Sequence, residues 1–383
     1  MRLAQKGAGF VNPNPKVGAV IVKDNKIIAG GFHRKFGALH AERDALRDAS
    51  ERGVDVRGAE MFVTLEPCCH FGKQPPCTQA IIESGIKKVY IGSRDPNPLV
   101  NGKGVKLLED AGIEVVRDFL RDECDALNPY FFHYIKTKTP YVILKYAVTA
   151  DGLTATSSGK SRWISNEKSR CHVHKIRSEV SAVMTAIATV KSDDPMLNVR
   201  LDDGEVHHQP VRIVLDSKIE LPSESKLSLT AREIPVLDGC ALNADEEASK
   251  RKAVLKNLGV EFLECEQKEN GHFDLELLFK KLGERNIDSV LVESGGGLNA
   301  SLLFENEEPL VNEVNVFIAP KIFGNDGKNV FSPVRGLGIE EVSDSVKLTK
   351  PQVDFFDDDI LLRFKTAQIK NEPSNGGSQR REK

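Results

Sequence analysis

Four residues near the N-terminus have the types and spacing of a hydrolytic metal site. His40 and Glu42 belong to an HAE triplet at an expected helix start, and Cys68 and Cys77 lie in the segment LEPCCHFGKQPPC. One imidazole and two thiolates suit the tetrahedral, borderline-soft preference of Zn²⁺. Three protein ligands leave a fourth position for water, and a nearby carboxylate can move its protons. The pattern predicts a hydrolytic deaminase with one zinc ion per chain, held by His40, Cys68 and Cys77, with Glu42 as the catalytic proton carrier.

A structural zinc site is the alternative interpretation of these cysteines. Structural sites usually have four protein ligands, and Cys69 or His70 would have to supply the fourth. The spacing of the ligands is also unusual, because the general deaminase signature is P-C-x-x-C, whereas Cys77 follows Cys68 by nine positions. We expect the inserted segment HFGKQPP to line the pocket.

Composition and charge limit the classes of partner. Hydrophobic residues make up 40% of the 383 residues and charged residues 28%, which is typical of a globular chain with buried cores, and the length suggests about two domains. A net charge of -3 with mixed signs offers no broad basic surface, which disfavours a nucleic-acid partner. Neither a signal peptide nor an apolar run near ~20 residues is found, which predicts a cytoplasmic protein without a membrane partner.

The first part of the chain alternates strand-like and helical patterns. The strand-like runs are VGAVIV, KIIAGGF, MFVTL, KKVYIGS and IEVV, and helical patterns begin near residues 40, 78 and 103. The first two runs predict an antiparallel hairpin, and the later alternation predicts a mostly parallel sheet. A helical stretch over about 119–135 leads into TKTKTP, where Pro140 marks a boundary. We therefore expect a first α/β domain over residues 1–139.

A second α/β pattern, about twice as long, begins at residue 140. Its strand-like runs include YVILKYAV, AVMTAI, VRIVLDS, VEFLE, SVLVES and VNVFIAPKIF, with helices near 166–178 and 246–257. The closing segments VKLTK, VDFFD and DILLRF predict an antiparallel meander with a solvated turn at 357–359. We expect this second domain to span residues 140–366 and the polar segment 367–383 to be disordered.

The N-terminal motifs resemble those of a known family, the bifunctional riboflavin-biosynthesis deaminase/reductases. The resemblance covers nearly the whole chain and rests here on PNPKVGAVIV, GGFH, HAE, LEPCCHFGKQPPC and DPNPLVNGKG. It implies a cytidine-deaminase-like three-layer α/β/α domain that acts on a small phosphoribosylaminopyrimidine. It also implies that four residues contact the pyrimidine or its ribose phosphate: Asn14, His33, His70 and Lys73. Each of them alone has an ordinary structural explanation, and Gln74 stands where the family commonly has Thr.

The C-terminal half resembles the reductase half of the same family, which has a dihydrofolate-reductase-like α/β fold. The matching segments include LKYAVTADGLTA, SGKSRWIS, VLDS and VESGGGLNASLL. The resemblance implies NADPH as the second cofactor and assigns to it Ala147, Trp163, Thr189, Asp193, Leu197, Ser217, Gly295, Gly296 and Gly297. It assigns to the ribosylamino phosphate substrate Ser161, Arg177, Arg200 and Glu293.

The residues themselves support the reductase site less sharply than the zinc site. A strand, a glycine triplet and a helix let backbone N–H groups approach a pyrophosphate, but glycine triplets also form ordinary turns. The triplet is not G-x-G-x-x-G, which disfavours the usual dinucleotide-binding fold. An isolated Arg is often a surface charge, and the single tryptophan could simply pack.

Two other functions remain as alternatives. One is a nucleic-acid deaminase with an appended domain, and the other is a protein in which only one of the two sites is active. The leading hypothesis is a bifunctional enzyme that replaces a ring amino group by hydrolysis and then reduces a ribosyl side chain to ribityl with NADPH. The sequence also allows a homo-oligomer.

Overall fold

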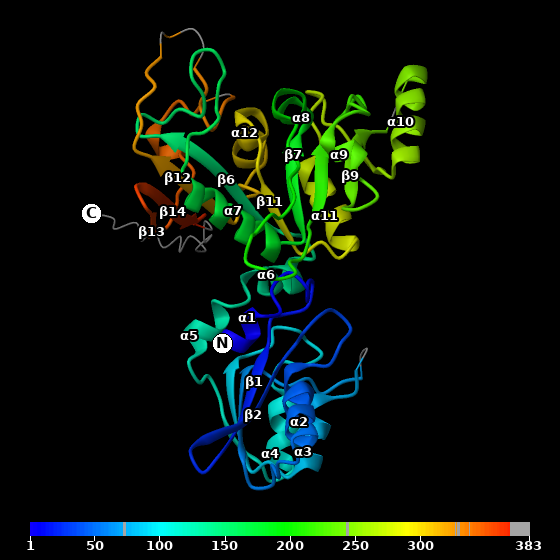
Figure 1. Cartoon of the computed structure of the whole chain (residues 1–383), viewed down its shortest axis with the longest axis vertical. Coiled ribbons are helices and arrows are strands. Elements are labelled where there is room, and N and C mark those ends of the chain that lie inside the picture. The colour runs from blue at the N-terminus through cyan, green and yellow to red at the C-terminus, as the bar shows by residue number, and fades with distance from the viewer. Residues whose placement is uncertain (72–73, 243–244, 326, 328–329, 337, 368–383) are drawn as a thin grey trace, which may run out of the picture.

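Two α/β units are stacked along the long axis of the molecule (Figure 1). The structure is a computed structural model, and it describes residues 1–71, 74–242, 245–325, 327, 330–336 and 338–367. The expected tail thus lies outside the described residues except for Ala367. Within the described residues, no helix is both long enough and apolar enough to cross a membrane.

The N-terminal sheet combines an antiparallel hairpin with parallel strands, as the sequence predicts. Its order is β2-β1-β3-β4-β5; β1 is antiparallel to β2 and β3, and β3, β4 and β5 are parallel. Asp24 and Asn25 both have positive φ, the geometry of the tight two-residue turn that matches strand twist. The strand bounds are β1 (Gly18–Lys23), β2 (Lys26–Phe32), β3 (Glu60–Leu65), β4 (Lys88–Ser93) and β5 (Glu114–Val116).

Helices cover both faces of this sheet. A Cβ at Gly31 would lie 2.2 Å from the backbone of Ala45 in α2, whereas a Cβ at the preceding Gly30 would lie 3.1 Å from Leu3 in α1. Because neighbouring strand residues face opposite sides, α1 and α2 lie on opposite faces. The result confirms the three-layer architecture (Figure 1), with the helices α1 (Arg2–Gln5), α2 (Ala41–Glu51), α3 (Cys77–Ser84), α4 (Lys103–Asp110) and α5 (Arg121–Asp125).

The C-terminal sheet has the order β10-β9-β8-β7-β11-β6-β12-β14-β13. The strands from β10 to β12 are parallel, and β14 is antiparallel to both β12 and β13. Their bounds are β6 (Tyr141–Thr149), β7 (Ala182–Ala186), β8 (Val211–Leu215), β9 (Val236–Ala241), β10 (Glu261–Cys265), β11 (Ser289–Val292), β12 (Glu313–Ala319), β13 (Gln352–Phe356) and β14 (Asp359–Lys365).

Both faces of the parallel part are buried. Val290 and Val292 of β11 belong to one apolar core, and Leu291 between them belongs to another. A strand buried on both faces needs a continuous apolar run, which explains the SVLV sequence. The surrounding helices are α7 (Glu167–Glu179), α8 (Ile187–Asp193), α9 (Lys226–Leu229), α10 (Glu246–Leu258), α11 (Leu275–Glu284), α12 (Gly296–Phe304) and the 3₁₀ turn η1 (Val342–Asp344).

The closing segments differ from the predicted meander in two respects. VKLTK forms only an isolated bridge between Leu348 and Thr366, so β13 and β14 make a hairpin. The turn at 357–359 is not fully solvated, because Asp359 is 2% exposed. Its carboxylate accepts hydrogen bonds from the Asn166 backbone N–H at 2.7 Å and from Ser169 Oγ at 2.6 Å. Asp359 thereby ties the hairpin to the start of α7.

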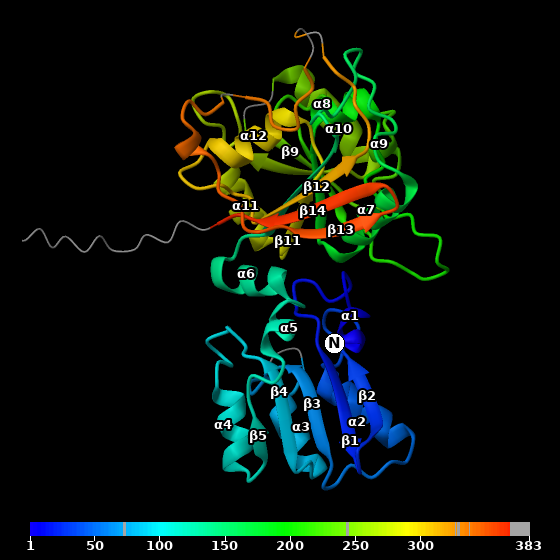
Figure 2. The same ribbon diagram turned by 90° about the vertical axis from the view of Figure 1, so that its left-hand side faces the viewer.

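One helix joins the two units. α6 (Pro129–Thr137) lies between them (Figure 2) and ends just before β6, next to the expected boundary at 139/140. Phe131 belongs to the N-terminal core, whereas the adjacent Tyr130 packs against a C-terminal core. Tyr134 Oη donates to the backbone oxygen of Gly283 at 2.9 Å. α6 is therefore packed into both units rather than being a free linker.

Candidate active sites

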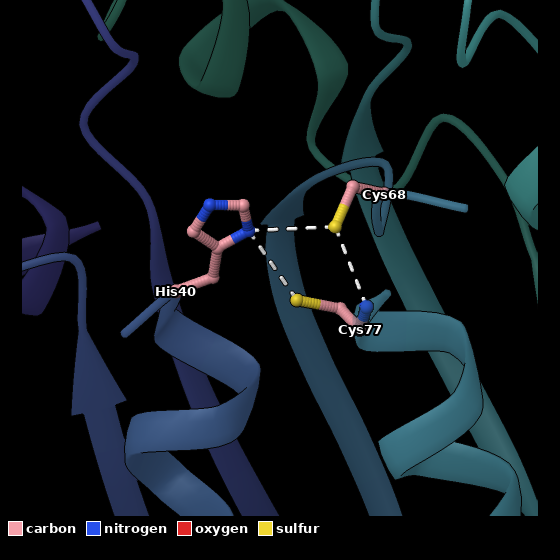
Figure 3. Close-up of side chains that lie close together, drawn as sticks. All are labelled: His40, Cys68 and Cys77. Carbon is pink, nitrogen blue, oxygen red and sulfur yellow. Dashed lines mark hydrogen bonds between the residues drawn. The ribbon is translucent and has the colours of Figure 1, made fainter. Parts of the chain in front are cut away.

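The three candidate zinc ligands converge where two helices begin (Figure 3). His40 is the N-cap of α2, Cys77 is the first residue of α3, and Cys68 lies in the segment after β3. His40 Nδ1 lies 3.4 Å from each of the two sulfur atoms. The three ligand atoms all lie within 4.8 Å of one another, and the backbone N–H of Cys77 donates to Cys68 Sγ at 3.3 Å. Residues from three separate segments thus form one cluster of ligand atoms.

The chemistry of this donor set fits zinc. Two thiolates and one imidazole are ligands that Zn²⁺ prefers, and the start of a helix favours thiolates. Among the described residues, no further His, Cys, Asp or Glu belongs to the group. Cys69 points elsewhere, because its Sγ lies 3.5 Å from the backbone oxygen of Leu99. A three-ligand set is the arrangement of catalytic rather than structural zinc sites.

Glu42 lies in the first turn of α2, two residues after the histidine ligand, and is only 3% exposed. Burial raises the pKa of its carboxyl group, because a charged carboxylate is disfavoured away from water. The side chain lines the same cavity as His40 and Cys68. A proton carrier is therefore available beside the ligands.

A cavity of about 310 Å³ opens over this cluster, and the described residues that line it include three of the four predicted deaminase-substrate residues, Asn14, His33 and His70. His33 Nδ1 lies 2.9 Å from the backbone oxygen of Leu39, and its Nε2 lies 3.2 Å from Asn14 Nδ2. Since a carbonyl only accepts, Nδ1 carries the proton and Nε2 accepts from the Asn14 amide. Burial lowers the pKa of His33, which favours this neutral form.

The inserted segment between the cysteines forms part of the cavity wall. Both His70 and Gln74 line the cavity, and Gln74 Nε2 donates to the backbone oxygen of Gly37 at 3.1 Å. Among the described residues, the Nδ1 atom of His70 is buried and has no hydrogen-bond partner, as expected of a group aimed at a ligand. Lys73 lies outside the described residues.

A charged cluster marks the second candidate site, at the end of β11. Glu293 accepts hydrogen bonds from Arg177 Nε at 2.6 Å and Arg177 Nη2 at 3.0 Å, and Lys145 Nζ of β6 lies 3.6 Å away. Burial alone would raise the pKa of Glu293, but the charges of Arg177 and Lys145 outweigh burial and hold the pKa at about 2. The site thus contains a carboxylate that stays ionised although it is buried.

Of the other predicted reductase-substrate residues, Arg177 belongs to this cluster and Arg200 lies near it. Arg177 Nη1 also donates to the backbone oxygen of Asn198 at 2.9 Å, and the Arg200 guanidinium donates to the Asn198 side chain. Arg177 is therefore occupied by Glu293 and the 198 backbone, whereas Arg200 is exposed. Ser161 is half-buried, two residues before the exposed Trp163.

The predicted NADPH residues come from several separate elements. Trp163 is 64% exposed, with the Arg170 guanidinium 4.5 Å from its ring centroid, and the Arg162 side chain links this segment to the backbone oxygen of Asp193. Leu197 is buried and has a positive φ of 50°, an uncommon conformation for leucine. Ala147 lies half-buried in β6.

Glycine residues at the start of α12 leave space beside this second site, because they have no side chains. Gly295 caps α12, and a Cβ there would lie 4.0 Å from Thr189 Oγ1 of α8. Ser217 and Gly297 line a common cavity of about 670 Å³ beside the ends of β7 and β8. The structure thus brings the glycine triplet, α8 and the end of β8 together, as a dinucleotide would require.

Comparisons with known proteins match both halves of the chain. The family model "Cytidine and deoxycytidylate deaminase zinc-binding region" matches residues 1–93, and "RibD C-terminal domain" matches residues 140–362. The riboflavin biosynthesis protein RibD of Actinobacillus pleuropneumoniae is 47% identical over 94% of this chain and 92% of the relative. The chain belongs to the RibD family. The Escherichia coli RibD is 34% identical over 95% of this chain and 96% of the relative.

Solved structures of RibD proteins agree over the whole length. The deaminase/reductase of Thermotoga maritima is 40% identical with a TM-score of 0.80, and Acinetobacter baumannii RibD is 36% identical with a TM-score of 0.82. Each comparison covers 96% of both chains. The chain is therefore a bifunctional enzyme of riboflavin biosynthesis with a zinc-dependent deaminase domain and an NADPH-dependent reductase domain. The predicted family, fold class and cofactors are confirmed.

RibD membership does not by itself reveal every side chain of the two cavities, and three were missed from sequence. Asp95 and Asn97 line the deaminase cavity, and burial raises the pKa of Asp95 to about 6. They lie in the DPNPLVNGKG motif, whose position supported the resemblance but whose acidic residue was given no role. Lys145 stands inside an apolar strand, where only its three-dimensional neighbours Arg177 and Glu293 reveal its importance.

Proposed function

We propose that this RibD enzyme deaminates 2,5-diamino-6-(5-phosphoribosylamino)pyrimidin-4(3H)-one to 5-amino-6-(5-phosphoribosylamino)uracil and then reduces the ribosyl side chain to ribityl. The name of the Thermotoga maritima relative, a diaminohydroxyphosphoribosylaminopyrimidine deaminase/5-amino-6-(5-phosphoribosylamino)uracil reductase, supports both steps. The single observation that carries the first step is the convergence of His40, Cys68 and Cys77 beside buried Glu42.

In the deamination, His40, Cys68 and Cys77 hold Zn²⁺, which supplies Lewis-acid activation of water at neutral pH. Glu42 takes a proton from the attacking water and delivers protons to the ring nitrogen and the departing amino group, so that water enters and ammonia leaves. Its raised pKa suits this exchange, because the group must hold a proton between the two transfers.

The cavity walls orient the pyrimidine. The Asn14–His33 pair fixes the tautomer of His33 and presents a polar edge to the ring. The Nδ1 atom of His70, which has no partner in the described part of the chain, is available to a polar group of the substrate, and Lys73 is proposed for the ribose phosphate. Asp95 adds a further polar group to the cavity wall.

In the reduction, NADPH would supply hydride to C1 of the open-chain or imine ribose, a proton from solvent would go to the atom doubly bonded to C1, and the protein would position both partners. Glu293 is held rigidly by Arg177 and Lys145, so its oxygens are oriented to accept hydrogen bonds from sugar hydroxyl groups. Arg200 is the arginine with exposed donors for the phosphate, and Ser161 completes the substrate side.

The proposed cofactor residues fall into two groups, which we assign to different parts of NADPH. We propose that Ala147, Trp163 and Leu197 contact the nicotinamide half of NADPH, and that Ser217 and Gly297, which line the cavity of about 670 Å³, contact the other half. Contacts with the remaining cofactor groups are proposed for Thr189, Asp193, Gly295 and Gly296.

Three further proposals concern the whole chain. The deaminase and reductase domains meet at 139/140, because β6 begins at Tyr141 directly after α6. The enzyme works in the cytoplasm on a free small molecule, without nucleic acid or membrane. We also propose that the enzyme can assemble into a homo-oligomer.

A Glu42→Gln variant tests the deamination directly. Ammonia release from the diaminopyrimidine phosphate should fall about 10²- to 10⁴-fold, while NADPH oxidation with the second-step substrate stays at the wild-type rate. Metal analysis should still give one zinc per chain, and mass spectrometry should identify the product of each step. Glu51→Gln, at the exposed end of α2, is the matched control. Ammonia release by Glu42→Gln at the control rate would remove Glu42 from the mechanism.

The same assays test the alternative that only one site is active. The cluster of His40, Cys68 and Cys77 and the ion pair between Arg177 and Glu293 support two working sites. Turnover of one substrate but not the other by zinc-loaded wild-type enzyme would support the half-active alternative.

A further inference from the structure

The cavity beside the glycine triplet has a distinct charge pattern. Its described lining residues come from the ends of β7 and β8, from α12, from residues 270–275 and from residues 335–336. Arg335 and Glu305 are the charged side chains among them, and His272 adds an imidazole. Such a charge set suits a group that carries negative charge.

This cavity corresponds to the adenosine half of the cofactor, an assignment that rests on the proposed function. It is lined by Ser217 and Gly297 from the cofactor set, but by none of the proposed substrate residues. Glu293, at the end of β11, marks the substrate side, and hydride transfer requires the nicotinamide to lie there. A dinucleotide that crosses the glycine triplet therefore places its adenosine ribose in the cavity.

Arg335 is anchored by its backbone while its guanidinium is left free. Its backbone N–H donates to the Gly296 oxygen at 2.9 Å. A Cβ at Gly296 would lie 2.8 Å from the Cβ of Arg335 and 2.7 Å from the Ser332 oxygen, so glycine is needed for this approach. Within the described part of the chain, no hydrogen bond or ion pair of the guanidinium is found, in contrast to Arg177.

The acidic residue of the cavity is already engaged. Glu305 accepts hydrogen bonds from His272 Nδ1 at 2.7 Å and from Ser301 Oγ at 2.8 Å. In sites that favour NADH, an acidic side chain is free to accept a hydrogen bond from the ribose 2′-hydroxyl. Both bonds go to Oε1, and Oε2 is buried without a hydrogen-bond partner among the described residues, so neither oxygen of Glu305 is both free and exposed to a ribose hydroxyl group.

We propose that Arg335, assisted by His272 and Ser217, binds the 2′-phosphate of NADPH and selects it over NADH. The planar guanidinium donates two parallel hydrogen bonds to phosphate oxygens. Glu305 orients the His272 ring toward the cavity, and the Ser217 hydroxyl adds a neutral donor at the end of β8. The glycine triplet then serves two purposes, close approach to the pyrophosphate and placement of Arg335.

Calorimetric titration of zinc-loaded, full-length enzyme with 2′,5′-ADP and with 5′-AMP tests the proposal without catalysis. The wild type should bind 2′,5′-ADP more tightly than 5′-AMP. Arg335→Ser should weaken 2′,5′-ADP binding about tenfold or more and leave 5′-AMP binding unchanged, because one charge-assisted contact is lost. Arg285→Ser, at the C-cap of α11 and paired with Glu261, is the control and should change neither affinity.

NADPH and NADH titrations extend the comparison to the whole cofactor. Arg335→Ser should reduce the preference for NADPH, and Arg335→Lys should keep part of it, because the charge remains without the planar pair of donors. If Arg335→Ser lost affinity equally for NADPH and NADH, or lost no affinity for either, the proposal would be overturned. If the wild type bound both dinucleotides equally, the selection by Arg335 would be wrong while the reductase assignment stands. Binding of neither dinucleotide would instead contradict the proposed reduction itself.

Discussion

The side-chain amide of Asn12, in the deaminase domain, lies 3.2 Å from the carboxylate of Asp288 in the reductase domain. The same Nδ2 atom lies 3.2 Å from the Glu179 backbone oxygen and 3.3 Å from Ser181 Oγ. Asp288 is 2% exposed, and burial raises its pKa. A single amide thus serves buried acceptors of the other domain, two residues before Asn14 of the deaminase cavity.

Removing this amide should weaken the contact between the domains. Asn12→Ala should lower the free energy of unfolding by about 1–3 kcal/mol, because the buried oxygens lose a donor. Asn12→Asp should cost more at neutral pH, since it places a second carboxyl group beside Asp288. Urea unfolding followed by circular dichroism measures both effects. Gln79→Ala, an exposed amide on α3, is the control, and an equal effect of the control would contradict the role of Asn12.

Glu293 should make stability depend on pH in the acid range. Its pKa is about 2 in the folded protein, below the value near 4.3 of a free glutamate, so its contribution is fully present above about pH 4.3. The contribution is lost as the pH falls through about 2. Glu293→Gln should destabilise the protein by about 3–5 kcal/mol at pH 7, because Arg177 and Lys145 lose their buried partner.

The difference between wild type and Glu293→Gln in urea unfolding should therefore shrink as the pH falls from about 4 to about 2. Glu247→Gln is the matched control, since Glu247 forms only an exposed ion pair with Arg251. A difference between wild type and Glu293→Gln that stays constant over this range would show that the carboxylate is not held ionised by its neighbours.

Removal of zinc should affect the two activities differently. The ligands join the starts of α2 and α3 to the segment after β3, so metal binding stabilises the folded deaminase domain. Chelation should abolish ammonia release, lower the melting temperature of this domain by about 5 °C or more, and leave NADPH oxidation intact.

A pair of cysteine variants separates a catalytic from a structural zinc site. Cys77→Ser should lose the metal, whereas Cys69→Ser should keep it, because Cys69 Sγ lies against the Leu99 oxygen. Metal analysis of the purified variants is the measurement. Loss of zinc in Cys69→Ser would indicate a fourth ligand and support the structural interpretation.

The sequence predicted those features that are local along the chain. The HAE triplet and the spacing of Cys68 and Cys77 predict the candidate zinc ligands that the fold brings together, because helix starts and ligand types are encoded within short segments. Long-range relationships escaped the sequence analysis. Lys145 meets Glu293, and Asn12 meets Asp288, only after the parallel strands are assembled. The local sequence around Lys145 or Asn12 does not indicate which residue will be its partner.

A strand was missed for a related reason. β9 has the sequence VLDGCA, and an Asp followed by Gly is typical of a turn rather than a strand. The packing of β9 between β8 and β10 overrides this local preference. Likewise, the sequence predicts a solvated turn at 357–359, because only the fold brings Asp359 to the start of α7.

The same strand carries a buried acid that should reduce stability at neutral pH. Asp238 is 0% exposed, and neither oxygen has a hydrogen-bond partner among the described residues. Burial, reinforced by Asp216, raises its pKa well above the usual value, so the folded protein retains a proton that the unfolded chain releases. The loss of stability that Asp238 causes is therefore present at high pH and shrinks as the pH falls. Asp238→Val should stabilise the protein by about 1–3 kcal/mol at pH 8 and by less at pH 5, as measured by urea unfolding. If the gain were absent, or larger at pH 5, Asp238 would have to be stabilised as a carboxylate in the folded state.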